Sequence, residues 1–150
     1  MIPNLFSKKP IPTELPNDMQ KVVAMLKRSK SRKDCIRKAY DVLAGKYKGR
    51  RLNTYLLFHQ LFMYDLEKLW KKSGFLHCTN MNYIMRILLI RSGFFKDEDI
   101  RFRYSLIWYI SIHQYLEVKL GKGSSMYVDV WGADNCVELG DHARGFHKSR

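Results

Sequence analysis

The chain has 150 residues, of which 46% are hydrophobic and 13% aromatic, and its formal net charge at pH 7 is +13. This composition excludes a wholly disordered or low-complexity protein, because the material for a packed core is present. No uninterrupted apolar segment approaches the roughly 20 residues that a membrane-spanning helix needs, so we expect no membrane association. The length suits a single domain.

The cysteines and histidines indicate a reducing compartment and no metal. Cys35, Cys78 and Cys136 form an odd set without paired spacing, and the N-terminus lacks the apolar core of a signal peptide. We therefore expect a cytoplasmic protein with free thiols. The gaps between Cys136, His142 and His147 match no strong zinc pattern. We expect neither a metal nor a cofactor.

The N-terminal part of the chain predicts an extended arm followed by helices. All four prolines lie within residues 1–16, which we expect to form an arm laid over a single domain of residues 17–150. Asn17 or Asp18 is predicted to cap a first helix that runs to about Lys30.

The second helix is predicted to begin after Ser31, with Asp34 completing a capping box, and to end at Gly45. Its helical spacing places four residues on one buried stripe: Ile36, Ala39, Tyr40 and Leu43.

The middle of the chain predicts a short helix and then a central one. Residues 64–72 are predicted to be helical, with a break at Ser73 and Gly74. The run that follows, GFLHCTNMNYIMRILLIRSG, is apolar almost all round, so its helix should be central, with Gly93 at its C-terminal cap position. Cys78 lies at the start of this helix, where exposed N–H groups and the helix dipole favour a thiolate.

The C-terminal part of the chain predicts antiparallel strands. Residues 100–120 are rich in β-branched and aromatic residues, residues 121–125 (GKGSS) carry a turn signal, and residues 126–131 (MYVDVW) read as another strand. Helices first and strands after indicate an α+β domain, with N-terminal helices and the Cys-bearing helix packed on an antiparallel sheet.

The strand register brings a histidine and an acid together. If residues 119–123 form the loop, His113 stands opposite Asp129, with the two Cβ atoms about 5 Å apart. A loop at residues 121–125 would instead oppose Asp129 to Glu117, and two carboxylates would repel. We therefore favour the first register. A thiol nucleophile needs such a base, steadied by a third group.

A Cys opens a central apolar helix, a later strand begins HQYLEV, and a VDVW segment follows it. These three features, in this order, resemble the transglutaminase-like superfamily, within the papain-like cysteine-peptidase architecture. The match covers roughly residues 30–131. The resemblance implies that Cys78 is the nucleophile, that His113 acts as general base and then acid, and that Asp129 orients His113. It implies a thioester intermediate resolved by water or by an amine.

The resemblance leaves the oxyanion hole and the substrate open. The Cys78 backbone N–H is expected to contribute, together with a side-chain donor from Gln60 or Trp70. Leu76 and Tyr115 differ from the family pattern, which often has Gly two residues before the Cys and Trp two after the His. No acidic loop suited to calcium is present.

Two functions are expected from these observations. The first is thiol-dependent acyl transfer or hydrolysis at a peptide or carboxamide bond, in a protein substrate that would be acidic if the basic surface recruits it. The alternative is an inactive transglutaminase-like binding module whose basic face contacts nucleic acid or an acidic protein. Residues 27–38 and 45–51 carry much of the positive charge.

Overall fold

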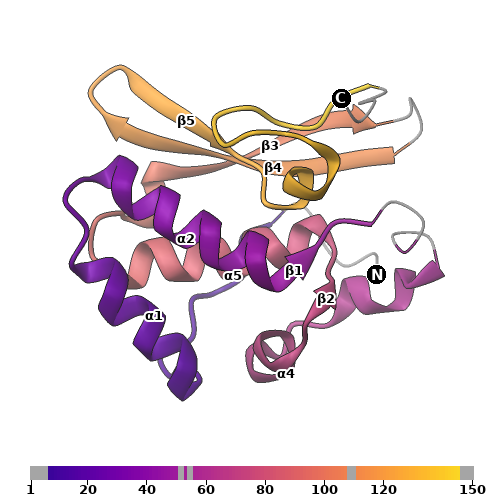
Figure 1. Cartoon of the computed structure of the whole chain (residues 1–150), viewed down its shortest axis with the longest axis horizontal. Coiled ribbons are helices and arrows are strands. Elements are labelled where there is room, and N and C mark those ends of the chain that lie inside the picture. The colour runs from indigo at the N-terminus through magenta and orange to yellow at the C-terminus, as the bar shows by residue number, and fades with distance from the viewer. Residues whose placement is uncertain (1–6, 51–52, 54–55, 108–110, 146–150) are drawn as a thin grey trace.

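The computed structural model of the chain describes residues 7–50, 53, 56–107 and 111–145. Helices pack against one face of a three-stranded antiparallel sheet (Figure 1). The α-helices precede the three strands of this sheet along the chain, so the α+β class predicted from the sequence is confirmed. Three longer helices form the helical layer: α1 (Asn17–Lys27), α2 (Arg32–Lys46) and α5 (Cys78–Arg91).

The first helix starts and ends earlier than predicted. Pro16 is the residue before it and provides no side-chain cap, so the predicted capping role of Asn17 or Asp18 is wrong. The Gln20 N–H donates to the Pro16 carbonyl at 3.0 Å, which makes Asn17 the first helical residue. The helix ends at Lys27 and not near Lys30, which leaves a short exposed turn before α2.

The second helix begins at the predicted place, but the predicted capping box is not formed, because Asp34 Oδ2 accepts from the Lys30 N–H and not from the Ser31 N–H. Ser31 Oγ accepts a hydrogen bond from the Asp34 N–H at 3.1 Å, and the whole predicted stripe is buried. Gly45 does not end this helix, which continues to Lys46. The end is set by tertiary pairing instead, because Tyr47 and Lys48 (β1) pair in parallel with Gly74 and Phe75 (β2).

The central helix α5 is buried along most of its length. Every residue from Asn80 to Leu89 is buried, including two asparagines and Arg86, and the positive φ of Gly93 (85°) follows the helix end as predicted. Before α5 the chain forms a 3-10 turn, η1 (Phe58–Phe62), and α4 (Leu66–Lys71). Helix α4 begins later than the predicted residue 64, because Asp65 caps it through the Lys68 N–H at 3.2 Å.

The sheet has the order β3 (Ile100–Ile107), β4 (Ser111–Gly121), β5 (Ser124–Val128), with both pairs antiparallel. Residues 108–110 of the predicted strand region lie outside the described residues. The apolar side chains between the sheet and the helices form one core that extends from Leu15 to Ala143.

The register between β4 and β5 differs from both alternatives derived from the sequence. Glu117 faces Tyr127 and Leu116 faces Val128, so the predicted pairing of His113 with Asp129 across the ladder is wrong. An irregularity between Lys119 and Gly121 shifts the pairing and leaves one extra residue on β4. Strand β5 therefore ends at Val128, one residue before the acid that was expected inside the strand.

Candidate active site

Cys78 is the first residue of α5, and its side chain is partly exposed. The preceding residue, His77, forms no side-chain capping bond, and the first turn carries no acid. The N–H groups at this helix end therefore stay free of a capping side chain among the described residues. Such groups stabilise a thiolate or another anion at the first turn.

His113 and Asp129 meet although their strands do not pair them. The distance from His113 Nε2 to Asp129 Oδ2 is 2.7 Å, and the two residues are 1% and 2% exposed. Continuing the ladder by one residue would set Asp129 beside Tyr115, two residues along the same face from His113. The chain leaves the strand at this point, and the Asp129 carboxylate reaches the imidazole diagonally.

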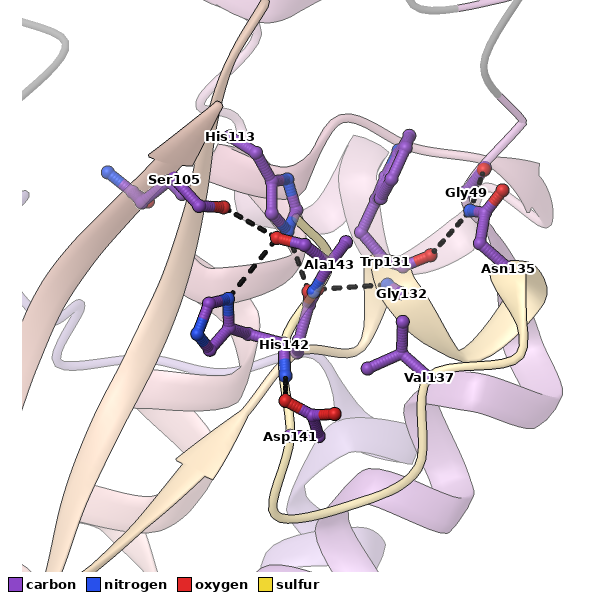
Figure 2. A network of polar contacts seen from close by, with 12 residues as sticks. Gly49, Ser105, His113, Trp131, Gly132, Asn135, Val137, Asp141, His142 and Ala143 are labelled. Carbon is purple, nitrogen blue, oxygen red and sulfur yellow. Dashed lines mark hydrogen bonds and ion pairs between the residues drawn. The ribbon is translucent and has the colours of Figure 1, made fainter. Parts of the chain in front are cut away.

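Two backbone groups, from Gly132 and Ala143 (both labelled in Figure 2), also hold the Asp129 carboxylate. The Gly132 N–H donates to Oδ1 at 2.9 Å, and the Ala143 N–H donates to Oδ2 at 2.8 Å. With His113, the carboxylate has three donors, which suits a group that accepts hydrogen bonds and donates none. The buried negative charge is thus compensated on both oxygens.

The imidazole of His113 joins the acid to the thiol. Burial alone would lower the pKa of His113, but the charge and hydrogen bond of Asp129, with a smaller contribution from the nearby Cys78, raise it to about 10. Because Nε2 is bonded to Asp129, Nδ1 is the nitrogen that remains for the sulfur. The ring is therefore held as an imidazolium near neutral pH.

Close packing against Trp131 and Gly132 also holds the His113–Asp129 pair in place. The Trp131 ring lies 4.9 Å from the His113 ring, centroid to centroid. A Cβ added to Gly132 would lie 2.8 Å from Asp129 Oδ2, and one added to Gly49 would lie 2.2 Å from the Trp131 carbonyl oxygen. Gly132 lets the backbone approach Asp129, and Gly49 lets it approach Trp131, in places where any side chain would clash.

The two candidates for an oxyanion donor have other partners. Trp70 is buried in α4, and the Lys46 ammonium lies 4.9 Å from its ring. The Gln60 side-chain oxygen accepts a hydrogen bond from Lys72. Within the described residues no hydrogen bond links either side chain to Cys78. The Gln60 carbonyl accepts from Asn80 Nδ2 at 3.1 Å, so η1 lies beside the first turn of α5.

His77, although next to Cys78 in sequence, has a structural contact. Burial lowers its pKa, so the ring is neutral, and its Nε2 lies 2.9 Å from the Leu57 carbonyl oxygen. The ring also packs edge-on against Phe75 at 4.9 Å. These contacts tie the segment before α4 to the start of α5.

The other two cysteines lie in different environments. Cys35 is fully buried in α2, and burial raises the pKa of its thiol. Cys136 is exposed and has a left-handed backbone conformation, with a φ of 59°. Among the described residues, no group of His, Cys, Asp or Glu is placed to hold a metal ion; His147 lies outside them.

Sequence reasoning missed the groups that hold Asp129. Ser105, Gly132 and Ala143 surround the carboxylate or its partners, and each of the three hydrogen bonds involved has a backbone atom on one side. The glycine three residues after Asp129 is the single signal that could have been noticed. Every residue except proline has a backbone N–H, so residue type does not show which of these groups act as donors here.

Within the described part of the chain, no helix is both long and apolar enough to cross a bilayer. Comparison of the sequence with protein-family models and with curated proteins, and of the structure with solved structures, found no match.

Proposed function

We propose that this protein is a thiol enzyme with a transglutaminase-like core that transfers or hydrolyses an acyl group at a peptide or carboxamide bond. One observation carries the proposal. The buried His113 lies 2.7 Å from Asp129 and interacts electrostatically with Cys78, which is the first residue of the central helix. A thiol, an imidazole and a carboxylate linked in this order are the groups that nucleophilic catalysis requires.

The first half of the reaction forms a thioester. The Cys78 thiolate attacks the amide carbonyl carbon, and the carbonyl electron pair moves to oxygen. The proton on His113 Nδ1 then passes to the leaving nitrogen as the C–N bond breaks. The raised pKa of His113 supports this role, because the imidazole carries the proton before the substrate is attacked.

The second half releases the acyl group. Neutral His113 takes a proton from water or from a lysine amine, whose oxygen or nitrogen attacks the thioester carbonyl. The C–S bond breaks, and the thiolate and the imidazolium are restored. Asp129 accepts from Nε2 throughout, which keeps Nδ1 directed at the sulfur.

The arrangement of elements also supports the proposal. The cysteine opens a buried helix, the histidine lies on the middle strand of an antiparallel sheet, and the acid follows the next strand. The cysteine, histidine and acid occur in the order in which the resembling superfamily has them.

The test is alkylation of Cys78 by iodoacetamide as a function of pH, followed by intact mass. A Cys136→Ser background removes the exposed thiol. We expect substantial reaction below pH 7, because the imidazolium stabilises the thiolate, and a strong loss of this reaction in His113→Gln. Turnover of an amide substrate should fall by about 10²–10⁴-fold without the His113 acid and base. A pH profile unchanged by His113→Gln would contradict the proposal.

A second candidate function is nucleic-acid binding by the basic segment from the end of α1 into α2, residues 27–37. Lys27, Arg28, Lys33 and Arg37 are exposed and take part in none of the ion pairs found among the described residues. Cations without ion-pair partners that extend from the end of α1 into α2 suit phosphate contacts, which release counterions. Fluorescence anisotropy with a labelled oligonucleotide at low and moderate salt tests this candidate. No binding at low salt would contradict it.

A further inference from the structure

The chain after Asp129 returns across the sheet. We call residues 137–145 the C-terminal strap. The Gly140 N–H donates to the Tyr127 carbonyl on β5 at 3.1 Å, and the Gly145 N–H donates to the Leu106 carbonyl on β3 at 2.8 Å. The strap therefore crosses from one edge strand to the other, over the face of β4 that carries His113.

Aromatic packing fixes the middle of the strap. The His142 ring stacks on Tyr115 of β4 with a centroid distance of 4.0 Å and an interplanar angle of 3°. Tyr127 packs edge-on against His142 at 5.3 Å. Ala143, the next residue along the strap, is 1% exposed.

Ala143 links β3 to the carboxylate through its two backbone groups. Its N–H donates to Asp129 Oδ2 at 2.8 Å, and its carbonyl accepts from Ser105 Oγ at 2.6 Å (Figure 2). His142 Nδ1 lies 3.2 Å from the same carbonyl. Ser105 is the ladder partner of His113, so both side chains lie on this face of the sheet.

Asp129 depends on these contacts because it lies outside the ladder. Strand β5 ends at Val128, so strand pairing does not fix the Asp129 backbone. Oδ2 receives two donors, His113 Nε2 and the Ala143 N–H. If Ala143 moved, the position of Oδ2 relative to the imidazole would rest on His113 alone.

We propose that Ser105 is a positioning residue: it holds Ala143 of the strap, and Ala143 holds Asp129 against His113. This inference rests on the proposed function, since the positioning serves the reaction of Cys78. Ser105 touches neither the thiol nor the substrate in this scheme. Its effect on Asp129 passes through the backbone of Ala143.

The experiment compares Ser105→Ala with Ser105→Thr, which keeps the hydroxyl. The matched control is Ser125→Ala, which removes a serine side-chain hydrogen bond (2.9 Å, to Glu117) elsewhere on the sheet. The readout is the pH profile of Cys78 alkylation in the Cys136→Ser background. We expect Ser105→Ala to slow alkylation near pH 6 by about 3- to 10-fold, the effect of losing one hydrogen bond. Ser105→Thr should restore the profile.

Ser105→Ala and Ser125→Ala should lower the melting temperature by similar amounts. If Ser105 had only a structural role, the two variants would therefore also have the same alkylation profile. If Ser105→Ala does not fold, Ser105→Thr is compared with Ser105→Val, which has the same shape without the hydroxyl. A His113-dependent wild-type profile that Ser105→Ala leaves unchanged overturns the positioning role alone. A wild-type profile that does not depend on His113 overturns the proposed function and the positioning role together.

Discussion

Two helices of this protein begin close to a cysteine, and their surroundings differ. At the start of α2, Ser31 Oγ accepts from the Asp34 N–H at 3.1 Å, and Asp34 Oδ2 accepts from the Lys30 N–H at 2.9 Å. At the start of α5, His77 provides no side-chain cap. In α2, a nearby side chain accepts a hydrogen bond from a backbone N–H of the first turn. In α5, the residue before the helix provides no such acceptor, so the N–H groups can bind an anion.

The thiols differ more than the helix ends do. Cys35 is sealed in the core, and burial raises its pKa. Cys78 is partly exposed and interacts with the His113 imidazole, which comes from β4. A cysteine near a helix start is thus not sufficient for reactivity. The partner from a distant strand, and access to solvent, make the difference.

The largest expected effect is the difference in alkylation rate between these two thiols. In the folded protein, Cys78 should react faster than Cys35 by about 100-fold or more, because Cys35 reacts only when the structure opens. Peptide mapping after brief iodoacetamide treatment measures both sites at once. Unfolding in urea is the control and should bring the two rates together. Similar rates in the folded state would remove the distinction between the two regions.

The pH dependence of stability sharpens the comparison. His113 has a raised pKa of about 10, so its stabilising contribution is complete below the unfolded value near 6.5 and is lost as the pH rises toward 10. The difference in unfolding free energy between wild type and His113→Gln should therefore narrow by about 2–3 kcal/mol between pH 6.5 and 9. Urea unfolding at both pH values measures it. A constant difference would mean that His113 is not held as an imidazolium.

Gly132→Ala should disturb the candidate active site while leaving Cys78, His113 and Asp129 themselves unsubstituted. The added Cβ would lie 2.8 Å from Asp129 Oδ2 and 2.9 Å from Val137 Cβ, so the carboxylate or the strap must move. We expect a loss of about 1–3 kcal/mol in unfolding free energy and slower alkylation of Cys78. Gly121→Ala is the matched control, because nothing lies within 4 Å of its Cβ position. Equal behaviour of the two variants would contradict the tight fit around Asp129.

The smallest effect is expected at the α2 start. Ser31→Ala removes the cap and should lower the unfolding free energy by about 1 kcal/mol. Because this cap has no part in the Cys78 region, the alkylation profile of Cys78 should stay unchanged. Denaturant unfolding and the alkylation assay together test this independence. A change in the Cys78 profile would show that the two helix starts are coupled.

Local patterns in the sequence predicted much of the fold. The buried stripe of α2, its Ser31 cap, the start of α5 at Cys78 and the positive φ of Gly93 all follow from neighbours within a few residues. Helical spacing and capping are short-range effects, so residue type alone carries them.

The strand register could not be predicted in this way. It depends on an extra residue of β4 between Lys119 and Gly121, and each such residue moves the ladder relative to the turn. The predicted meeting of His113 and Asp129 occurs, but by a diagonal contact beyond the end of β5 and not by the predicted pairing.

The sequence by itself determined the α+β class, the central helix and the cysteine at its start, because these depend on local periodicity and burial. The tertiary structure alone decided how the Asp129 carboxylate is held, because its donors include the Gly132 and Ala143 N–H groups. Every residue except proline carries such a group. Only the path of the folded chain selects which of them face the acid.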